Sequence, residues 1–194
     1  TFGAVARLSG GRVGPSVAVV YTTIVRGIPD LVLILLVYFG GQRLVNDIGG
    51  ILGLDYIEIS KFWAGVAAIG FIYGAYLTET FRGAYLTVPK GQAEAAKALG
   101  LARLQTFFLV VAPQVLRFAL PGYANVWLVL VKSTAVVSVI GLPDLVGLAD
   151  KAGKATREPF LFFIAVIFVY LAITSVSGWG FARVDARLNR GQSA

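Results

Sequence analysis

Long apolar stretches alternate with short charged segments along the whole chain. The clearest stretch lies between Glu158 and Arg183, where 24 consecutive residues carry no charged side chain. A helix needs about 20 apolar residues to cross the ~30 Å hydrocarbon core of a bilayer. The stretch begins with Pro159, a residue suited to the first turn of a helix. This pattern predicts a membrane-spanning helix near the C-terminus.

Two further apolar stretches precede it. Residues 62–78 are rich in small side chains, including Gly65, Gly70 and Gly74, which let neighbouring helices approach closely. In residues 17–41 the apolar run is interrupted between Arg26 and Asp30, which would be neighbours on an unbroken helix. The intervening glycine and proline instead predict an interfacial segment followed by a separate span over residues 31–41.

A fourth apolar region, residues 107–142, is interrupted by prolines, glycines and two cations. The interrupting residues are Pro113, Arg117, Pro121, Gly122, Lys132 and Gly141. Broken helices at membrane depth are tolerated against protein or a water-filled cavity, so we expect this region to line a pathway. Residues 1–12 are typical of the end of another helix, and the absence of methionine indicates that Thr1 is not a natural start. We therefore expect four spans in view and five in the full protein.

Composition supports a membrane protein and narrows the chemistry. Of the 194 residues, 57% are hydrophobic and 14% are charged, and the mean hydropathy is +0.79. Soluble domains carry roughly 25% charged residues. Cysteine and histidine are both absent, which excludes disulfides, cysteine-ligated metals and histidine-based triads or metal sites. The net charge of +7 is spread along the chain, with no compact basic domain for nucleic acid.

The distribution of cations predicts the orientation, because cytoplasmic loops carry an excess of lysine and arginine. One side would hold ten cations: Arg7, Arg12, Arg26, Arg82, Lys90, Lys97, Arg103, Arg183, Arg187 and Arg190. The loops on the other side would hold five, Arg43, Lys61, Lys151, Lys154 and Arg157, diluted by Asp47, Asp55, Glu58, Asp144, Asp150 and Glu158. We expect the 82–105 loop and the C-terminus in the cytoplasm.

The loop after the second span predicts a compact pair of helices. Pro89 ends one helix, residues 91–99 are rich in strong helix formers, and Gly100 is a suitable C-terminal cap. A further helix is predicted from Leu101. The short helix has an apolar face of Ala95, Ala98 and Leu99, which favours a partner groove over a solvated connector.

This loop resembles the EAA motif of bacterial ABC importer permeases. Glu94-Ala95-Ala96 is followed after three residues by Gly100 and after nine more by Val110-x-Ala112-Pro113, where the family usually has Ile-x-Leu-Pro. Residues 26–40, 75–92, 119–145 and 152–160 are similar to the polar amino-acid permeases. The similarity is greatest to the branch that handles histidine, lysine, arginine, ornithine and opines.

The resemblance implies an all-α polytopic fold, the type I ABC importer permease fold with five transmembrane helices. Residues 1–194 would form a single transmembrane permease domain, and residues 88–113 its cytoplasmic coupling loop. The partners implied are two ATPase subunits, a second permease that is a sister chain or an identical copy, a periplasmic solute-binding protein, the amino-acid substrate and the lipid bilayer. No nucleic acid is expected. The chain has no Walker-type phosphate loop, so no cofactor is expected here, and ATP and Mg²⁺ would bind the partner ATPase.

Candidate functional residues fall into two groups. The resemblance assigns ATPase coupling to Lys90, Gly91, Glu94, Ala95, Ala96 and Gly100. The expected substrate pathway comprises Glu79, Arg82, Asn125, Lys132, Ser133 and Thr134. Glu79 and Arg82 are either an ion pair at the interface or two charges that meet the ammonium and carboxylate of a substrate. Lys132 either lines the path or extends to the membrane interface.

The function expected is ATP-driven import of polar, and most of all basic, amino acids or opines by alternating access in the bacterial inner membrane. The chain would not itself be an enzyme. An ATP-independent channel or secondary transporter is the alternative, but it leaves the amphipathic loop helix unexplained. An intramembrane enzyme is disfavoured because histidine, cysteine and paired intramembrane aspartates are missing.

Overall fold

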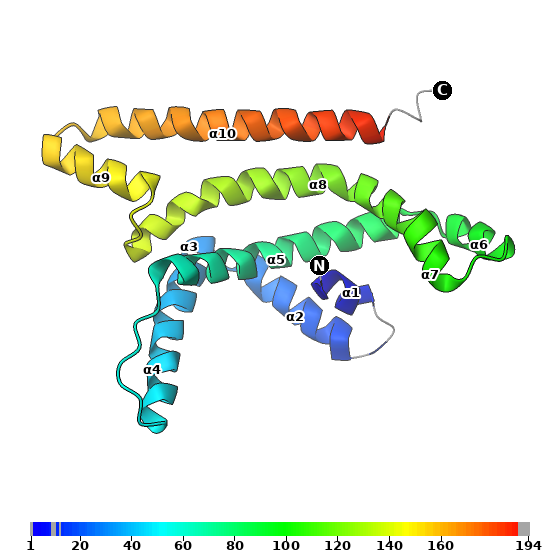
Figure 1. Cartoon of the computed structure of the whole chain (residues 1–194), viewed down its shortest axis with the longest axis horizontal. Coiled ribbons are helices and arrows are strands. Elements are labelled where there is room, and N and C mark those ends of the chain that lie inside the picture. Colours follow the sequence, from blue (N-terminus) through cyan, green and yellow to red (C-terminus); the bar gives the residue numbers. More distant parts are fainter. Residues whose placement is uncertain (1, 9–10, 12, 190–194) are drawn as a thin grey trace. The chain divides into compact units, whose positions relative to one another are not determined.

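The fold is helical throughout the part of the chain that the structure describes. The structure is a computed structural model, and it describes residues 2–8, 11 and 13–189. No strand occurs within these residues, and Figure 1 shows the helices in chain order. Thr1, Arg12 and Arg190, which entered the sequence argument, lie outside the described residues. The predicted all-α class is confirmed.

The chain divides into two compact units. Unit 1 comprises Thr1–Thr23, Ala75–Leu128 and Val176–Ala194, and unit 2 comprises Ile24–Gly74 and Val129–Ser175. The helices in order are α1 (Phe2–Leu8), α2 (Val13–Gly27), α3 (Asp30–Leu35), η1 (Leu36–Gly40), α4 (Gly41–Ile51), α5 (Lys61–Thr87), α6 (Lys90–Ala98), α7 (Arg103–Thr106), η2 (Phe107–Val111), α8 (Ala112–Ser133), η3 (Thr134–Ile140), α9 (Leu145–Thr156) and α10 (Pro159–Leu188). Four of these elements, α2, α5, α8 and α10, contribute residues to both units.

Three helical stretches in the described residues are long and apolar enough to cross a membrane. They are Asp30–Ile51, Arg103–Ile140 and Pro159–Leu188. Each matches a span predicted from the sequence, and α10 begins at Pro159 as expected. Most side chains of α10 are exposed in the isolated chain, as expected for a helix surrounded by lipid or partner subunits.

The remaining predicted span, residues 62–78, lies in helix α5, which is not among those three stretches. The helix is 27 residues long, which is sufficient to cross a bilayer, yet its glycines, tyrosines and charged residues make it less apolar. Ala68, Ile72 and Ala75 are 0% exposed, so much of this helix faces protein. A helix buried against protein does not need the apolar surface that contact with lipid requires.

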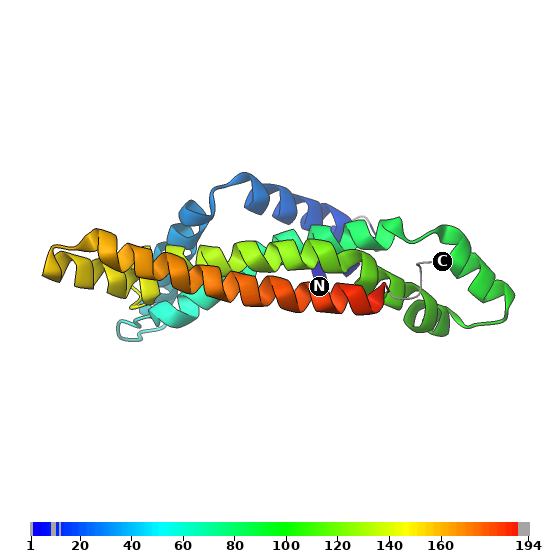
Figure 2. The same ribbon diagram turned by 90° about the horizontal axis from the view of Figure 1, so that it is seen from above.

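The predicted break before the first of these spans is present. Helix α2 ends at Gly27, Pro29 has an extended backbone (φ −57°, ψ 136°), and α3 begins at Asp30. Arg26 and Asp30 therefore lie on different helices. The short non-helical link that joins the end of α2 to the start of α3 is drawn in blue in Figure 2.

The C-terminal end of that span lies later in the chain than predicted. The expected end was residue 41, with Arg43 and Asp47 counted among the loop charges. Helical structure instead continues through a π-helical turn, η1, into α4 and ends at Ile51. Arg43 and Asp47 form an exposed i,i+4 ion pair of 3.6 Å on α4, and such pairs support a helix at a membrane boundary.

The region 107–142 is less broken than predicted. Helical structure runs from Arg103 to Ile140, and Pro121 lies inside α8 without ending it. A π-helical turn, η2, comes before Pro113, and Gln114 Nε2 donates to the Val110 carbonyl at 2.9 Å. The real change of geometry comes after Ser133, where the chain becomes a 3₁₀ helix.

Candidate functional site

The predicted coupling loop forms the two-helix arrangement expected from its sequence. Helix α5 ends at Thr87, and Pro89 holds an extended backbone before α6 begins at Lys90. Gly100 has φ +85°, a conformation that L side chains rarely adopt, and it reverses the chain after α6. Helix α7 begins at Arg103, two residues later than predicted, and Gln105 Oε1 accepts from the backbone N–H of Ala102 at 2.9 Å.

Helix α6 turns one face inward and leaves another face open. Ala96 is 4% exposed, and α6 packs against η2. The predicted apolar face of Ala95, Ala98 and Leu99 is exposed, with Leu99 at 82%. Glu94 is the fifth residue of the helix and lies beyond its first turn.

A shallow groove accompanies α6 within unit 1. Its volume is about 280 Å³, and Lys90, Ala93, Glu94 and Lys97 line one side of it. Val88 and Val111 line other parts of the groove. Two of the predicted coupling residues, Lys90 and Glu94, therefore present their side chains at one concave surface.

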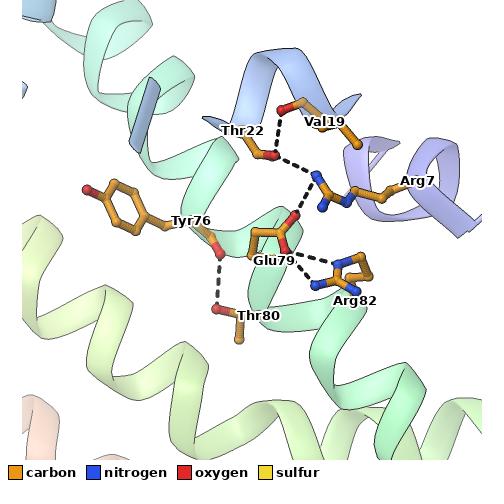
Figure 3. A network of polar contacts seen from close by, with 7 residues as sticks. All are labelled: Arg7, Val19, Thr22, Tyr76, Glu79, Thr80 and Arg82. Carbon is orange, nitrogen blue, oxygen red and sulfur yellow. Dashed lines mark hydrogen bonds and ion pairs between the residues drawn. The ribbon is translucent and has the colours of Figure 1, made fainter. Parts of the chain in front are cut away.

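Glu79 is the centre of an ion-pair network in unit 1 (Figure 3). Arg82 donates from Nε to Glu79 Oε2 at 3.0 Å, and its Nη2 lies 2.9 Å from the same oxygen. Arg7, on α1, places Nη1 3.2 Å from Glu79 Oε1. The predicted pair of Glu79 and Arg82 thus exists, but the sequence analysis missed its third member. A separation of 72 residues gives no local signal that could have identified Arg7.

The network ties the N-terminal helices to α5. Arg7 Nη1 also donates to Thr22 Oγ1 at 2.8 Å, and Thr22 is 2% exposed on α2. Thr22 in turn donates to the Val19 carbonyl at 3.2 Å, as Figure 3 shows. Glu79 Oε1 is buried and close to Arg7 but lacks hydrogen-bond geometry. With two guanidinium groups and one carboxylate, the network carries a net charge of 2 − 1 = +1.

A second polar cluster lies in unit 2. The phenolic O–H of Tyr73 donates to Asp30 Oδ2 at 2.9 Å, and Tyr73 also shares a short hydrogen bond with the Ser133 hydroxyl. Tyr73 is 3% exposed. Ser133 was predicted from the sequence, whereas Asp30 and Tyr73 were not identified as part of a site. The pattern offered one signal, because a charged residue beside a helix break in a membrane segment indicates a functional position.

The neighbouring hydroxyl, that of Thr134, bonds the backbone where the helix type changes. Thr134 Oγ1 donates to the Val131 carbonyl at 2.7 Å, where the α-helix changes into a 3₁₀ helix. Thr134 also lies 3.3 Å from the phenolic oxygen of Tyr170 on α10. The change of helix type leaves a backbone carbonyl without its usual N–H donor. A hydroxyl three residues later can donate a hydrogen bond to that carbonyl.

The remaining pathway candidates, Asn125 and Lys132, both lie on α8 and are exposed. Lys132 forms no ion pair with any residue that the structure describes. Glu79, Arg82 and Asn125 belong to unit 1, whereas Lys132, Ser133 and Thr134 belong to unit 2. The structure therefore places the six predicted residues in two separate groups.

Comparison with known proteins gives a consistent family. Residues 1–190 match the family described as binding-protein-dependent transport system inner membrane component. The chain is 47% identical over 189 residues to the histidine/lysine/arginine/ornithine transport system permease protein HisQ of Salmonella typhimurium, covering 97% of this chain and 83% of HisQ. It is 42% identical to the octopine transport system permease protein OccQ of Rhizobium radiobacter, covering 97% of this chain and 80% of OccQ.

The fold agrees with that relationship. The chain superimposes on the crystal structure of an amino acid ABC transporter with histidines at a TM-score of 0.80 and 31% identity, covering 96% of this chain and 82% of that one. The chain belongs to the family of inner-membrane permease components of binding-protein-dependent transport systems.

Proposed function

We propose that the chain is the permease subunit of an ATP-driven importer that carries basic amino acids or opines into the cytoplasm by alternating access. The relatives support this substrate class, because their names specify histidine, lysine, arginine, ornithine and octopine. ATP binding and hydrolysis on partner subunits would bias the permease between two packings of its helices. The chain itself would perform no chemistry and bind no ATP or Mg²⁺.

The exposed apolar face of α6 is the observation that carries the proposal. Ala95, Ala98 and Leu99 are open to solvent in the isolated chain, while Ala96 packs inward. An amphipathic helix that exposes apolar residues on a charged cytoplasmic loop favours insertion into a groove of another protein. An ABC ATPase subunit is the partner that this family needs at that position.

The proposed orientation places α6 and the C-terminus in the cytoplasm. The excess of cations on that side supports it, since eight of the ten cations counted there lie among the described residues. The two exceptions are Arg12 and Arg190. The full assembly would contain two ATPases, a second permease and a periplasmic solute-binding protein.

The proposed substrate pathway retains its six residues, with a changed role for Glu79. Because two arginines already share the Glu79 carboxylate, the network has an excess positive charge that would attract the carboxylate of a substrate. Arg82 is the more exposed of the two arginines, at 31% against 20%. Asn125, Lys132, Ser133 and Thr134 are proposed to line the remainder of the path.

A single substitution on α6 tests the proposed coupling. Leu99→Glu should abolish copurification of the ATPase and lower ATP-dependent arginine uptake at least about tenfold, because a buried charge in an apolar interface costs several kcal/mol. Leu52→Glu is the matched control, since Leu52 is also exposed, at 68%, but follows α4. Both variants should reach the membrane at the level of the unsubstituted chain.

The same experiment separates the alternative function. An ATP-independent channel or secondary transporter would carry arginine without any ATPase and would be insensitive to Leu99→Glu. Full uptake by Leu99→Glu, with the ATPase still bound, would contradict the assignment of α6 as the coupling helix.

A further inference from the structure

Asp30 differs in its partners from Asp47, Glu79 and Asp150, three other acidic residues that lie in helices. Asp47, Glu79 and Asp150 each have an arginine or lysine within 4.0 Å. Asp30 has none among the residues that the structure describes, although it begins a helical stretch long and apolar enough to cross a membrane. A carboxylate in such a segment is costly without a cationic partner and indicates a functional site.

The hydrogen bonds of Asp30 orient its carboxylate without neutralising it. Tyr73 donates to one oxygen, Oδ2, at 2.9 Å, and Tyr73 is fixed in turn by the Ser133 hydroxyl. Tyr73 is 3% exposed, whereas Asp30 is partly exposed. The other oxygen, Oδ1, accepts no hydrogen bond within the described part of the chain and is left for a ligand.

The cluster also lies where two helices change course. The chain leaves α2 at Gly27 and starts α3 at Asp30, and α8 becomes the 3₁₀ helix η3 directly after Ser133. Discontinuous helices of this kind form the substrate sites of many membrane transporters, because the interruption exposes polar groups at membrane depth. Tyr73, on continuous α5, connects the two interruptions.

A cavity in the same unit is lined by chain neighbours of the cluster, although not by Asp30, Tyr73 or Ser133 themselves. Its volume is about 540 Å³, within the range of small-molecule sites. Thr134, next in the chain to Ser133, lines it, as does Gly70, which lies one helical turn before Tyr73. Tyr170 adds a hydroxyl, and Asp144 adds a carboxylate whose Oδ1 accepts from the Gly147 N–H at 2.9 Å. The remaining lining is largely apolar, which suits the aliphatic part of a long side chain.

From this geometry we infer that Asp30 binds the positively charged side-chain group of a basic amino acid during its passage, with Tyr73 and Ser133 as positioning residues. The inference rests on the proposed function and adds the residue that selects the substrate. A guanidinium or ammonium N–H would donate to Oδ1 while Tyr73 keeps Oδ2 in place. A neutral amino acid of the same shape would leave the carboxylate unpaired. A site that leaves a polar group unpaired in this way strongly rejects the analogue in favour of the charged substrate.

The test compares arginine with citrulline, which replaces the guanidinium by a neutral ureido group of nearly the same shape. The complete complex of permeases, ATPases and binding protein is reconstituted in liposomes, and ATP-driven uptake of both amino acids is measured at saturating binding protein. Asp30→Asn should lower the arginine-to-citrulline uptake ratio at least about tenfold, mostly through loss of arginine uptake.

Two further variants separate charge from packing. Asp30→Glu keeps the charge and should retain a preference for arginine, which a purely structural role of the aspartate would not predict. Asp47→Asn is the matched control in the same unit, because Asp47 is exposed and already paired with Arg43. Its uptake ratio should equal that of the unsubstituted complex.

The outcomes distinguish this inference from the proposed function. An unchanged ratio in Asp30→Asn, or an equal loss of arginine and citrulline uptake, would overturn the role of Asp30 while leaving the importer intact. Failure of the unsubstituted complex to import arginine with ATP would overturn the proposed function, and the Asp30 site with it.

Discussion

The charge network around Glu79 should contribute measurably to the stability of the chain. Glu79→Gln keeps the size of the side chain but removes the charge that Arg7 and Arg82 share, at distances of 2.9 to 3.2 Å. The exposed fractions of the three side chains are 15% for Glu79, 20% for Arg7 and 31% for Arg82. The substitution would leave two guanidinium groups facing a neutral amide.

The size of the effect follows from this burial. Exposed ion pairs contribute about 0–1 kcal/mol, whereas removing one partner of a buried pair costs about 3–5 kcal/mol. The Glu79 network lies between these limits, and a glutamine oxygen can still accept one hydrogen bond. We therefore expect Glu79→Gln to lower the free energy of unfolding by about 2–3 kcal/mol.

Denaturant unfolding of the purified permease in detergent micelles measures this loss. The double variant Arg7→Gln with Glu79→Gln should be more stable than the sum of the single variants predicts, by about 1 kcal/mol, because it leaves one unpaired arginine, Arg82, where Glu79→Gln alone leaves two. Glu58→Gln, in the exposed segment before α5, serves as the control and should change stability by less than about 0.5 kcal/mol. A Glu79→Gln variant as stable as this control would refute the reasoning.

Three other substitutions test the local geometry. Gly100→Ala, at φ +85°, should lower the free energy of unfolding by about 1–2 kcal/mol. It should also lower the ratio of arginine imported to ATP hydrolysed, and an unchanged ratio would contradict a role for this turn. Gly153→Ala places a Cβ 2.7 Å from the backbone Cα of Pro159 and should lower the unfolding midpoint, while Gly70→Ala, with no atom within 4 Å, should not. Asp144→Ala removes the cap on the Gly147 N–H (2.9 Å) and should increase hydrogen exchange at the start of α9 through a loss of about 1 kcal/mol; unchanged exchange there would count against the cap.

Local signals predicted the helices and several of their ends. Pro89 and Gly100 bracket α6 to within a residue of its observed ends, and the break before Asp30 follows from the glycine and proline that precede it. These features depend on the backbone preferences of single residues, so the sequence carries them directly. The same rules failed at Pro121, because packing of the surrounding helix outweighs the local preference.

The sequence by itself therefore determined an all-helical membrane permease, the position of the short loop helix α6 and the family to which the chain belongs. Only the tertiary structure decided which charges meet. Arg7 reaches Glu79 across 72 residues, and Tyr73 bonds Asp30 across 43 residues and Ser133 across 60. Helical periodicity specifies which face of a helix a residue occupies, but it does not specify which other helix packs there. That pairing depends on the packing of side chains from distant segments. For this reason only the tertiary structure shows that the Glu79 carboxylate is paired with two arginines, whereas the Asp30 carboxylate accepts a hydrogen bond from Tyr73 and has no basic partner among the described residues.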